Sequence, residues 1–263
     1  MTVNQGLSSS RRVYPALLVA AICLGITFCE WVFAYQDVAY GIILALLLAL
    51  VIYVILPVIK AGPAFNDVAE SLALIPLYIL LTSSLPWFFL SQEFLLPAVY
   101  SVVLALCGWH IYRKNISLRQ IGFHKDKWLR YILTGILVGI PLGVSEYFII
   151  TPAAAFPSFE IRYLFRDLAY MVVFVGLGEE LLFRGLVQRE MTNLLGWKWG
   201  LIGASLMFGV MHLTWRSIPE LLFTSSAGSL FGYLYYRTRS LIVPIIAHGV
   251  GNTILVAVMP YLL

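Results

Sequence analysis

Residues 171–187 read MVVFVGLGEELLFRGLV and place two acids and one base, Glu179, Glu180 and Arg184, inside an otherwise apolar run. One such charge at the centre of a membrane helix opposes insertion by roughly 2.5–3.5 kcal/mol. The three charges together oppose insertion by on the order of 8–10 kcal/mol unless other groups compensate them. The rest of the chain is therefore expected to supply polar partners for this helix.

The composition indicates a polytopic membrane protein. Of the 263 residues, 61% are hydrophobic and only 11% are charged, whereas soluble domains carry about 25% charged residues. The formal net charge of +4 is dispersed over short loops, so it does not indicate a nucleic-acid partner. The three cysteines lie in apolar runs without a C-x-x-C motif, which argues against a disulfide framework.

The predicted fold is an all-α, polytopic transmembrane helical bundle of about nine spans, with eight spans as the alternative. Residues 1–165 are expected to form N-terminal transmembrane helices and a basic cytoplasmic loop, and residues 166–263 a catalytic helical core made from the last four spans. Loops rich in Pro with Gly or Ala are predicted at 61–67 and 151–163. The predicted spans are 16–35, 38–59, 69–90, 94–112, 128–150, 168–195, 199–213, 219–236 and 241–259.

The distribution of basic residues predicts the orientation. When the N-terminus is placed in the cytoplasm, most of the 17 Lys and Arg residues fall in cytoplasmic loops, and only Arg162, Arg166 and Arg216 fall outside. This asymmetry follows the positive-inside rule. No organelle-targeting signal is recognisable. We therefore expect a multi-pass protein of the cell membrane, in a prokaryotic inner membrane, with a cytoplasmic N-terminus.

Two short motifs in later spans can supply polar partners. Phe208 and His212 lie four residues apart in the seventh span, and His248 and Asn252 lie four residues apart in the ninth. Residues at this spacing share one face of a helix. A rise of 1.5 Å per residue puts these polar groups and Glu179 at similar depth in the membrane. They meet if the sixth, seventh and ninth spans pack together.

Three motifs in the last hundred residues resemble, in their order and spacing, those of a known family. They read Glu179-Glu180-x-x-x-Arg184, Phe208-x-x-x-His212 and His248-x-x-x-Asn252. The resemblance is to the CPBP family, the CAAX-protease and bacteriocin-processing intramembrane proteases, also called the Abi family and related to the Ras-converting enzyme (CAAX prenyl protease 2). It covers residues 166–259, and the first five spans resemble nothing beyond general hydropathy.

The resemblance implies an intramembrane endopeptidase that hydrolyses a peptide bond near the terminus of a membrane-associated protein or peptide. Glu179 would activate a water, and His212 would help to hold that water. His248 and Asn252 would stabilise the oxyanion of the substrate carbonyl.

The chemistry of the residues agrees with these roles. A buried carboxylate is a usable general base, and a neighbouring histidine can share the water or pass on its proton. An amide and an imidazole can donate to an oxyanion, a role worth roughly 2.7–4 kcal/mol. Glu180 and Arg184 have the favourable acid-first i, i+4 order, so a supporting salt bridge is expected between them.

A zinc-dependent mechanism is the alternative to a cofactor-free one. Glu179, His212 and His248 together could hold zinc and leave a fourth position for water. The chain contains no H-E-x-x-H motif, and the acids and histidines sit on separate helices. These two features favour the metal-free glutamate mechanism, with zinc left open.

Two other function classes remain as alternatives. A proton-coupled transporter could use the acids and histidines as a relay, although the polar groups crowd into the last hundred residues rather than into two repeated halves. A non-catalytic scaffold could use the same pairs to hold helices together. The expected partners are a membrane-associated substrate and the lipid bilayer, and we favour a bacterial or archaeal peptide or sorting tail as the substrate.

Overall fold

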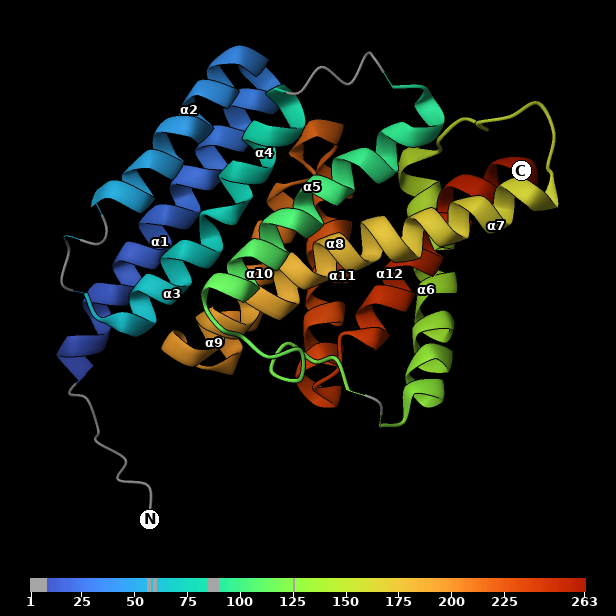
Figure 1. The fold of residues 1–263 in the computed structure, drawn as a ribbon. Coiled ribbons are helices and arrows are strands. Elements are labelled where there is room, and N and C mark those ends of the chain that lie inside the picture. The colour runs from blue at the N-terminus through green and yellow to red at the C-terminus, as the bar shows by residue number, and fades with distance from the viewer. Residues whose placement is uncertain (1–8, 56–57, 59–60, 85–89, 125) are drawn as a thin grey trace.

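The computed structural model describes residues 9–55, 58, 61–84, 90–124 and 126–263. These residues form helices and short connections, and no strand occurs among them. The predicted all-α bundle is therefore confirmed (Figure 1). The predicted end of the second span at residue 59 lies outside the described part of the chain, as do residues 85–89 of the third. The division of the chain at residue 166 stays a prediction.

Among the described residues, six helices are long and apolar enough to cross a membrane. They coincide within a few residues with the predicted first to fifth and ninth spans. The three remaining predicted spans are helical too, but they are shorter or more polar, so the total of nine spans stays a prediction. The six helices are Tyr14–Gln36, Val38–Ile55, Pro63–Ser83, Glu93–Arg113, Trp128–Ile150 and Ile242–Tyr261.

The first four helices form a sub-bundle along one side of the molecule (Figure 1). They are α1 (Ser9–Trp31), α2 (Val38–Leu50), α3 (Pro63–Leu72) and α4 (Leu74–Ser84). Asp37 begins α2 by accepting a hydrogen bond from the backbone of Tyr40, as an N-cap residue should. Phe65, Leu72 and Ile75 are completely buried, so α3 and α4 supply the core of this sub-bundle.

The predicted loop 61–67 is wrong beyond residue 62. Helix α3 already begins at Pro63, because proline fits the first turn of a helix, where its missing N–H leaves no intrahelical bond unmade. The preceding Gly62 has a φ of 102°, which turns the chain sharply into the helix.

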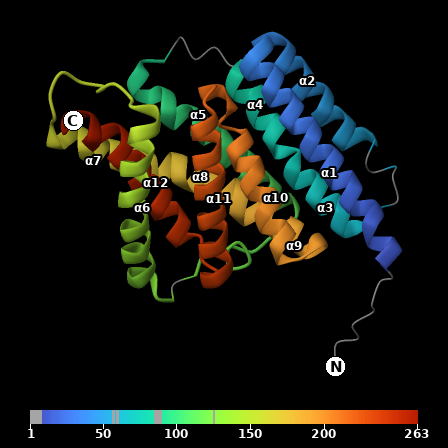
Figure 2. The same cartoon turned by 180° about the vertical axis from the view of Figure 1, so that it is seen from behind.

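Helices α5 (Gln92–Arg113) and α6 (Trp128–Ile150) flank the polar loop. Three glycines of α6 lie four residues apart and face α12 (Ile242–Thr253), which lies beside α6 in both views (Figures 1 and 2). A Cβ at Gly139 would lie 2.5 Å from the carbonyl oxygen of Ala247, and one at Gly143 would overlap that of Gly251. Small residues at this spacing let membrane helices approach closely.

One continuous helix crosses the bundle obliquely (Figure 1). It consists of α7 (Ile161–Tyr170), wide π-helical turns at Met171–Gly176, α8 (Leu177–Glu180), further wide turns at Leu181–Gln188, and α9 (Arg189–Leu195). Glycine at 196, with a φ of 90°, ends it.

This helix starts about two turns before the predicted residue 168, so the predicted loop 151–163 is wrong from 161 onward. The helix can start this early because aromatic rings pack against its basic residue Arg166. Arg166 lies 5.0 Å from the ring centroids of both Phe156 and Tyr163, and these two rings stack at 3.8 Å.

The last three long helices lie behind the oblique helix in Figure 1 and in front of it in Figure 2. They are α10 (Trp197–Val210), α11 (Ile218–Thr238) and α12, which continues to residue 261. Ser217 begins α11 by accepting a hydrogen bond from the backbone of Glu220. The 14 residues of α10 span only about 21 Å at 1.5 Å per residue. The helix is therefore shorter than the roughly 30 Å of a hydrocarbon core.

Candidate active site

The oblique helix carries the acidic motif between its two sets of wide turns. Glu179, Glu180 and Arg184 are 8%, 0% and 1% exposed. Wide turns of this kind recur at functional sites, and here they flank Leu177–Glu180 on both sides. Buried charges are costly unless they are paired and hydrogen-bonded, so the surroundings of these three side chains decide what they do.

Glu180 is the centre of a buried hydrogen-bonded group. Its Oε1 accepts a hydrogen bond from Nη1 of Arg184 at 2.9 Å, which is the predicted i, i+4 pair. The same oxygen lies 2.8 Å from Nδ1 of His248. Because a carboxylate oxygen only accepts, Nδ1 of His248 carries the proton. Glu180 therefore fixes the tautomer and orientation of the His248 ring, a more specific role than the supporting pair that was predicted.

Arg184 is satisfied by helix α11 as well. Its Nη2 donates to the carbonyl of Gly228 at 2.9 Å, and one turn later Nε2 of Gln188 donates to the carbonyl of Gly232 at 2.9 Å. The Phe208 ring covers the guanidinium at 4.4 Å, within the range of a cation–π contact. A Cβ at Gly232 would lie 2.6 Å from the Gln188 side chain. The glycines of α11, which have no side chain, thus leave space for the side chains of Arg184 and Gln188.

Glu179 is held from helix α5. Its Oε1 accepts a hydrogen bond from the hydroxyl of Tyr100 at 2.5 Å. Its Oε2 has no hydrogen-bond partner among the described residues and lies 3.8 Å from Nε2 of His248. Glu179 is therefore the acid with a free oxygen, oriented by a tyrosine and turned toward His248.

His212 closes the end of α10. Its Nδ1 lies 2.9 Å from the carbonyl of Phe208, and because a carbonyl only accepts, Nδ1 carries the proton. In the neutral ring Nε2 is then an acceptor. The Phe208 ring lies between the two histidines, with centroids 5.0 Å from His212 and 5.7 Å from His248. The predicted convergence of the sixth, seventh and ninth spans is thus observed.

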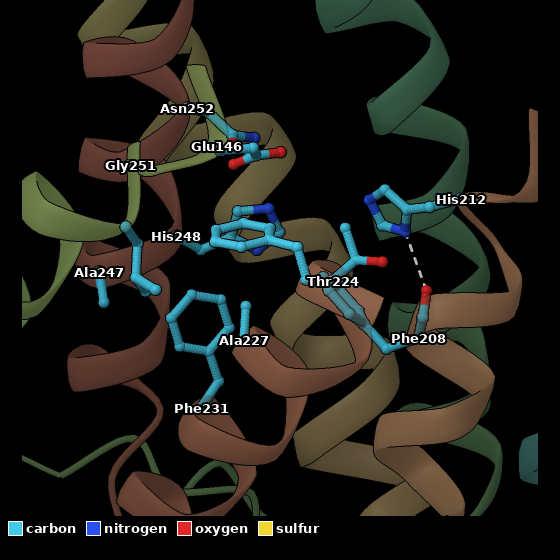
Figure 3. A pocket seen from close by; sticks show the side chains of 12 residues that line it. Glu146, Phe208, His212, Thr224, Ala227, Phe231, Ala247, His248, Gly251 and Asn252 are labelled. Atoms are coloured by element: carbon cyan, nitrogen blue, oxygen red, sulfur yellow. Dashed lines mark hydrogen bonds between the residues drawn. The ribbon is translucent and has the colours of Figure 1, made fainter. Parts of the chain in front are cut away.

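A small cavity lies among α6, α10, α11 and α12 (Figure 3). Its volume is about 30 Å³, which exceeds the roughly 10–15 Å³ that one water needs. Five of its lining residues can bind a water: Glu146, His212, Thr224, His248 and Asn252. Glu179 is not among the lining residues, but its free Oε2 lies 3.8 Å from Nε2 of His248, which is one of them.

Glu146 is a further acid at this cavity. It comes from α6 and lines the cavity directly. Glu220 of α11 is another buried acid, 0% exposed, and neither of its carboxylate oxygens has a hydrogen-bond partner among the described residues. Glu146 thus brings a carboxyl to the edge of the cavity.

Two of these residues were missed by the sequence analysis. Tyr100 is one of 15 tyrosines and had no nearby acid in the sequence to mark it. Glu146 could have been found, because an ionisable residue within a predicted span is a functional candidate by default.

The zinc alternative finds no ready set of ligands. Within the described ranges, no group of three or more His, Cys, Asp or Glu side chains is placed to hold a metal ion. The hydrogen bonds of Nδ1 of His212, Nδ1 of His248 and Oε1 of Glu179 leave the other nitrogen or oxygen of each side chain uncommitted, and such bonds are also usual for histidines that bind a metal. Zinc therefore stays an alternative to the metal-free mechanism.

Comparison with known families agrees with the motifs. Residues 162–254 match the family model described as Rce1-like, type II CAAX prenyl endopeptidase Rce1-like. The matched segment contains all six predicted site residues, whereas Tyr100 and Glu146 lie outside it. No curated protein and no solved structure matches the chain.

Proposed function

Residues 162–254 are an Rce1-like domain of the type II CAAX prenyl endopeptidase family, and on that premise we propose that the chain is an intramembrane endopeptidase. It hydrolyses a peptide bond near the terminus of a membrane-associated protein or peptide. One observation carries the proposal. Glu179 keeps a free oxygen 3.8 Å from Nε2 of His248, while Glu180 accepts a hydrogen bond from Nδ1 of the same ring.

Charge balance supports a donor role for His248. Arg184 neutralises one of the two adjacent carboxylates, and an imidazolium at His248 would neutralise the other. The buried group then carries no net charge, which lowers the cost of keeping it out of water. In this form Nδ1–H donates to Glu180, and Nε2–H is free for the oxygen of a substrate. The amide of Asn252 provides a second donor at the cavity.

The hydrolysis then follows from these groups. In the proposed reaction, a water at the free Oε2 of Glu179, beside the cavity, gives a proton to that carboxylate and attacks the substrate carbonyl carbon, with His212 as its second hydrogen-bond partner. The resulting oxyanion is stabilised by His248 and Asn252. When the carbon–nitrogen bond breaks, Glu179 returns the proton to the departing nitrogen. Water is thereby divided between a new carboxyl and a new amine, and no cofactor takes part.

Glu146 is the second candidate for the base, because it lines the cavity directly. We favour Glu179 because Tyr100 orients it and because it lies in the matched segment. The two carboxyls are separable by substitution, since they come from different helices.

The test is cleavage of membrane-anchored and C-terminally lipidated peptides by the purified protein. Glu179→Gln is expected to lower kcat by roughly 10²–10⁴-fold, the usual contribution of a general base, with the melting temperature nearly unchanged. Glu30→Gln is the matched control, because Glu30 is also buried (2% exposed) but lies on α1. Equal cleavage by wild type and Glu179→Gln would refute the assignment. Proton flux in liposomes that depends on Glu179, without peptide cleavage, would favour the transporter. If Glu179→Gln lowers only the stability and no cleavage is found for wild type, the scaffold is favoured.

We also propose that the N-terminus and the basic loop 113–127 face the cytoplasm, in a prokaryotic inner membrane. The excess of Lys and Arg on that side supports this orientation. In sealed cells, an impermeant thiol reagent should label Ser158→Cys and not Lys127→Cys. The opposite labelling would reverse the orientation. For substrates we favour a peptide or sorting tail of a prokaryotic protein.

A further inference from the structure

A second, polar cavity lies where the basic loop meets the ends of α9 and α11. Its volume is about 230 Å³, many times the ~15 Å³ that holds one water. Three arginines from three segments line it: Arg119 from the loop, Arg189 from α9 and Arg239 from the end of α11. Gln188 and Asn193 also line it. This cavity is distinct from the candidate active site and shares no lining residue with the water-sized cavity.

The charges at this cavity are not balanced by the protein. Arg189 donates to Glu190 at 2.5 Å, and Asn193 holds the second oxygen of Glu190 at 3.0 Å. Among the described residues, neither Arg119 nor Arg239 has a carboxylate partner. Both side chains are exposed, so water screens their charges, and an anion between them would accept charge-assisted hydrogen bonds from both guanidinium groups.

The backbone beneath these arginines is fixed in place. The N–H of Leu241 donates to the carbonyl of Gly122 at 3.1 Å, and the His124 ring lies 3.1 Å from the carbonyl of Arg239. Gly122 has a φ of 97°, and a Cβ there would lie 2.9 Å from the nitrogen of Leu241. The loop that carries Arg119 is thereby tied to the segment that carries Arg239, so the two charges are held near each other before any ligand arrives.

Aromatic residues beside the cavity mark its depth. The rings of Trp197 and Tyr236 stack at 4.8 Å, and Nζ of Lys198 lies 5.7 Å from the Trp197 ring. Trp199 nearby is 65% exposed. Tryptophan and tyrosine gather at the level of lipid headgroups, with lysine at the same boundary. The most abundant anion at that level is the phosphate of a phospholipid.

Gln188 lines the same cavity and connects it to α11, because its Nε2 donates to the carbonyl of Gly232. From these contacts we propose that the cavity binds the headgroup of a phospholipid with a net negative charge, such as phosphatidylglycerol. Its phosphate lies between Arg119 and Arg239.

The lipid would act on the neighbouring site through Gln188. Gln188 lies one helical turn after Arg184, and both side chains donate hydrogen bonds to carbonyls of α11. A bound headgroup therefore stabilises the junction of α9, α11 and the loop, and with it the position of Arg184. The effect on stability is independent of whether the protein cleaves peptides.

Thermal unfolding of the full chain in a neutral detergent tests the proposal. Phosphatidylglycerol is expected to raise the melting temperature of wild type by roughly 5 °C at saturating concentration, and phosphatidylcholine is not. The double variant Arg119→Gln/Arg239→Gln should lose this increase. Arg237→Gln is the matched control and should keep it, because Arg237 is exposed in the same helical turn but does not line the cavity.

Three results would overturn the proposal. The first is an equal increase in the double variant and in wild type. The second is an equal increase with phosphatidylcholine, which lacks net charge. The third is an equal increase with glycerol phosphate or inorganic phosphate alone, which would make the cavity a site for soluble phosphate rather than for a lipid.

Discussion

Tyr100→Phe tests whether the active site extends beyond the matched segment. The change removes only the hydroxyl that donates to Oε1 of Glu179 at 2.5 Å. A hydrogen bond to a charged group contributes about 1.5–3 kcal/mol. If the bond serves to orient the base, its loss appears in the activation free energy, where each 1.36 kcal/mol is a factor of ten. We therefore expect kcat to fall roughly 10- to 150-fold, with KM little changed.

The assay measures initial rates over a range of concentrations of a peptide that wild type cleaves, together with the melting temperature. Tyr53→Phe is the matched control, because the Tyr53 hydroxyl is buried without a hydrogen-bond partner among the described residues. It should leave kcat unchanged. If Tyr100→Phe keeps the wild-type kcat, or if Tyr53→Phe loses as much, the reasoning about orientation is refuted.

Three further predictions follow from neighbouring contacts. Glu146→Gln should keep most of the wild-type cleavage rate, whereas Glu179→Gln should lose it. A slower Glu146→Gln and a nearly normal Glu179→Gln would make Glu146 the base. Arg184→Ala should cost about 3–5 kcal/mol of stability, because it leaves Glu180 charged and buried, and chemical unfolding in detergent would measure this. Gly143→Ala should destabilise by about 1–3 kcal/mol through overlap with α12, whereas Gly108→Ala, where a Cβ meets nothing within 4 Å, should be neutral in the same assay.

Local patterns predicted most of the helices and one contact of the site. The spacing of Glu180 and Arg184 indicated a salt bridge, and the structure has it at 2.9 Å. Such a pair is determined by helix geometry alone, because side chains four residues apart lie one above the other. The apolar runs predicted the spans for a similar reason, since length and hydropathy are properties of a single segment.

The helix ends that were missed depend on contacts between segments. Residues 161–163 were predicted to belong to the loop 151–163, and the helix was predicted to start only at residue 168. In the fold, Arg166 pairs with Asp167 at 2.6 Å and stacks on Phe156. An aromatic ring contributed from the preceding connection cannot be read from the hydropathy of the helix itself.

The non-local contacts of the site show why motifs describe only part of it. The three motifs contain every group that the proposed reaction uses, yet the orientation of Glu179 comes from Tyr100, 79 residues earlier in the chain. A tyrosine on an apolar helix is usually a packing residue, so nothing in its own segment distinguishes it. The same holds for the glycines of α6, whose importance is visible only against α12. If the proposed mechanism holds, α5 and α6 belong to the catalytic unit, because α5 supplies the hydroxyl bound to Glu179 and α6 the close surface against which α12 packs.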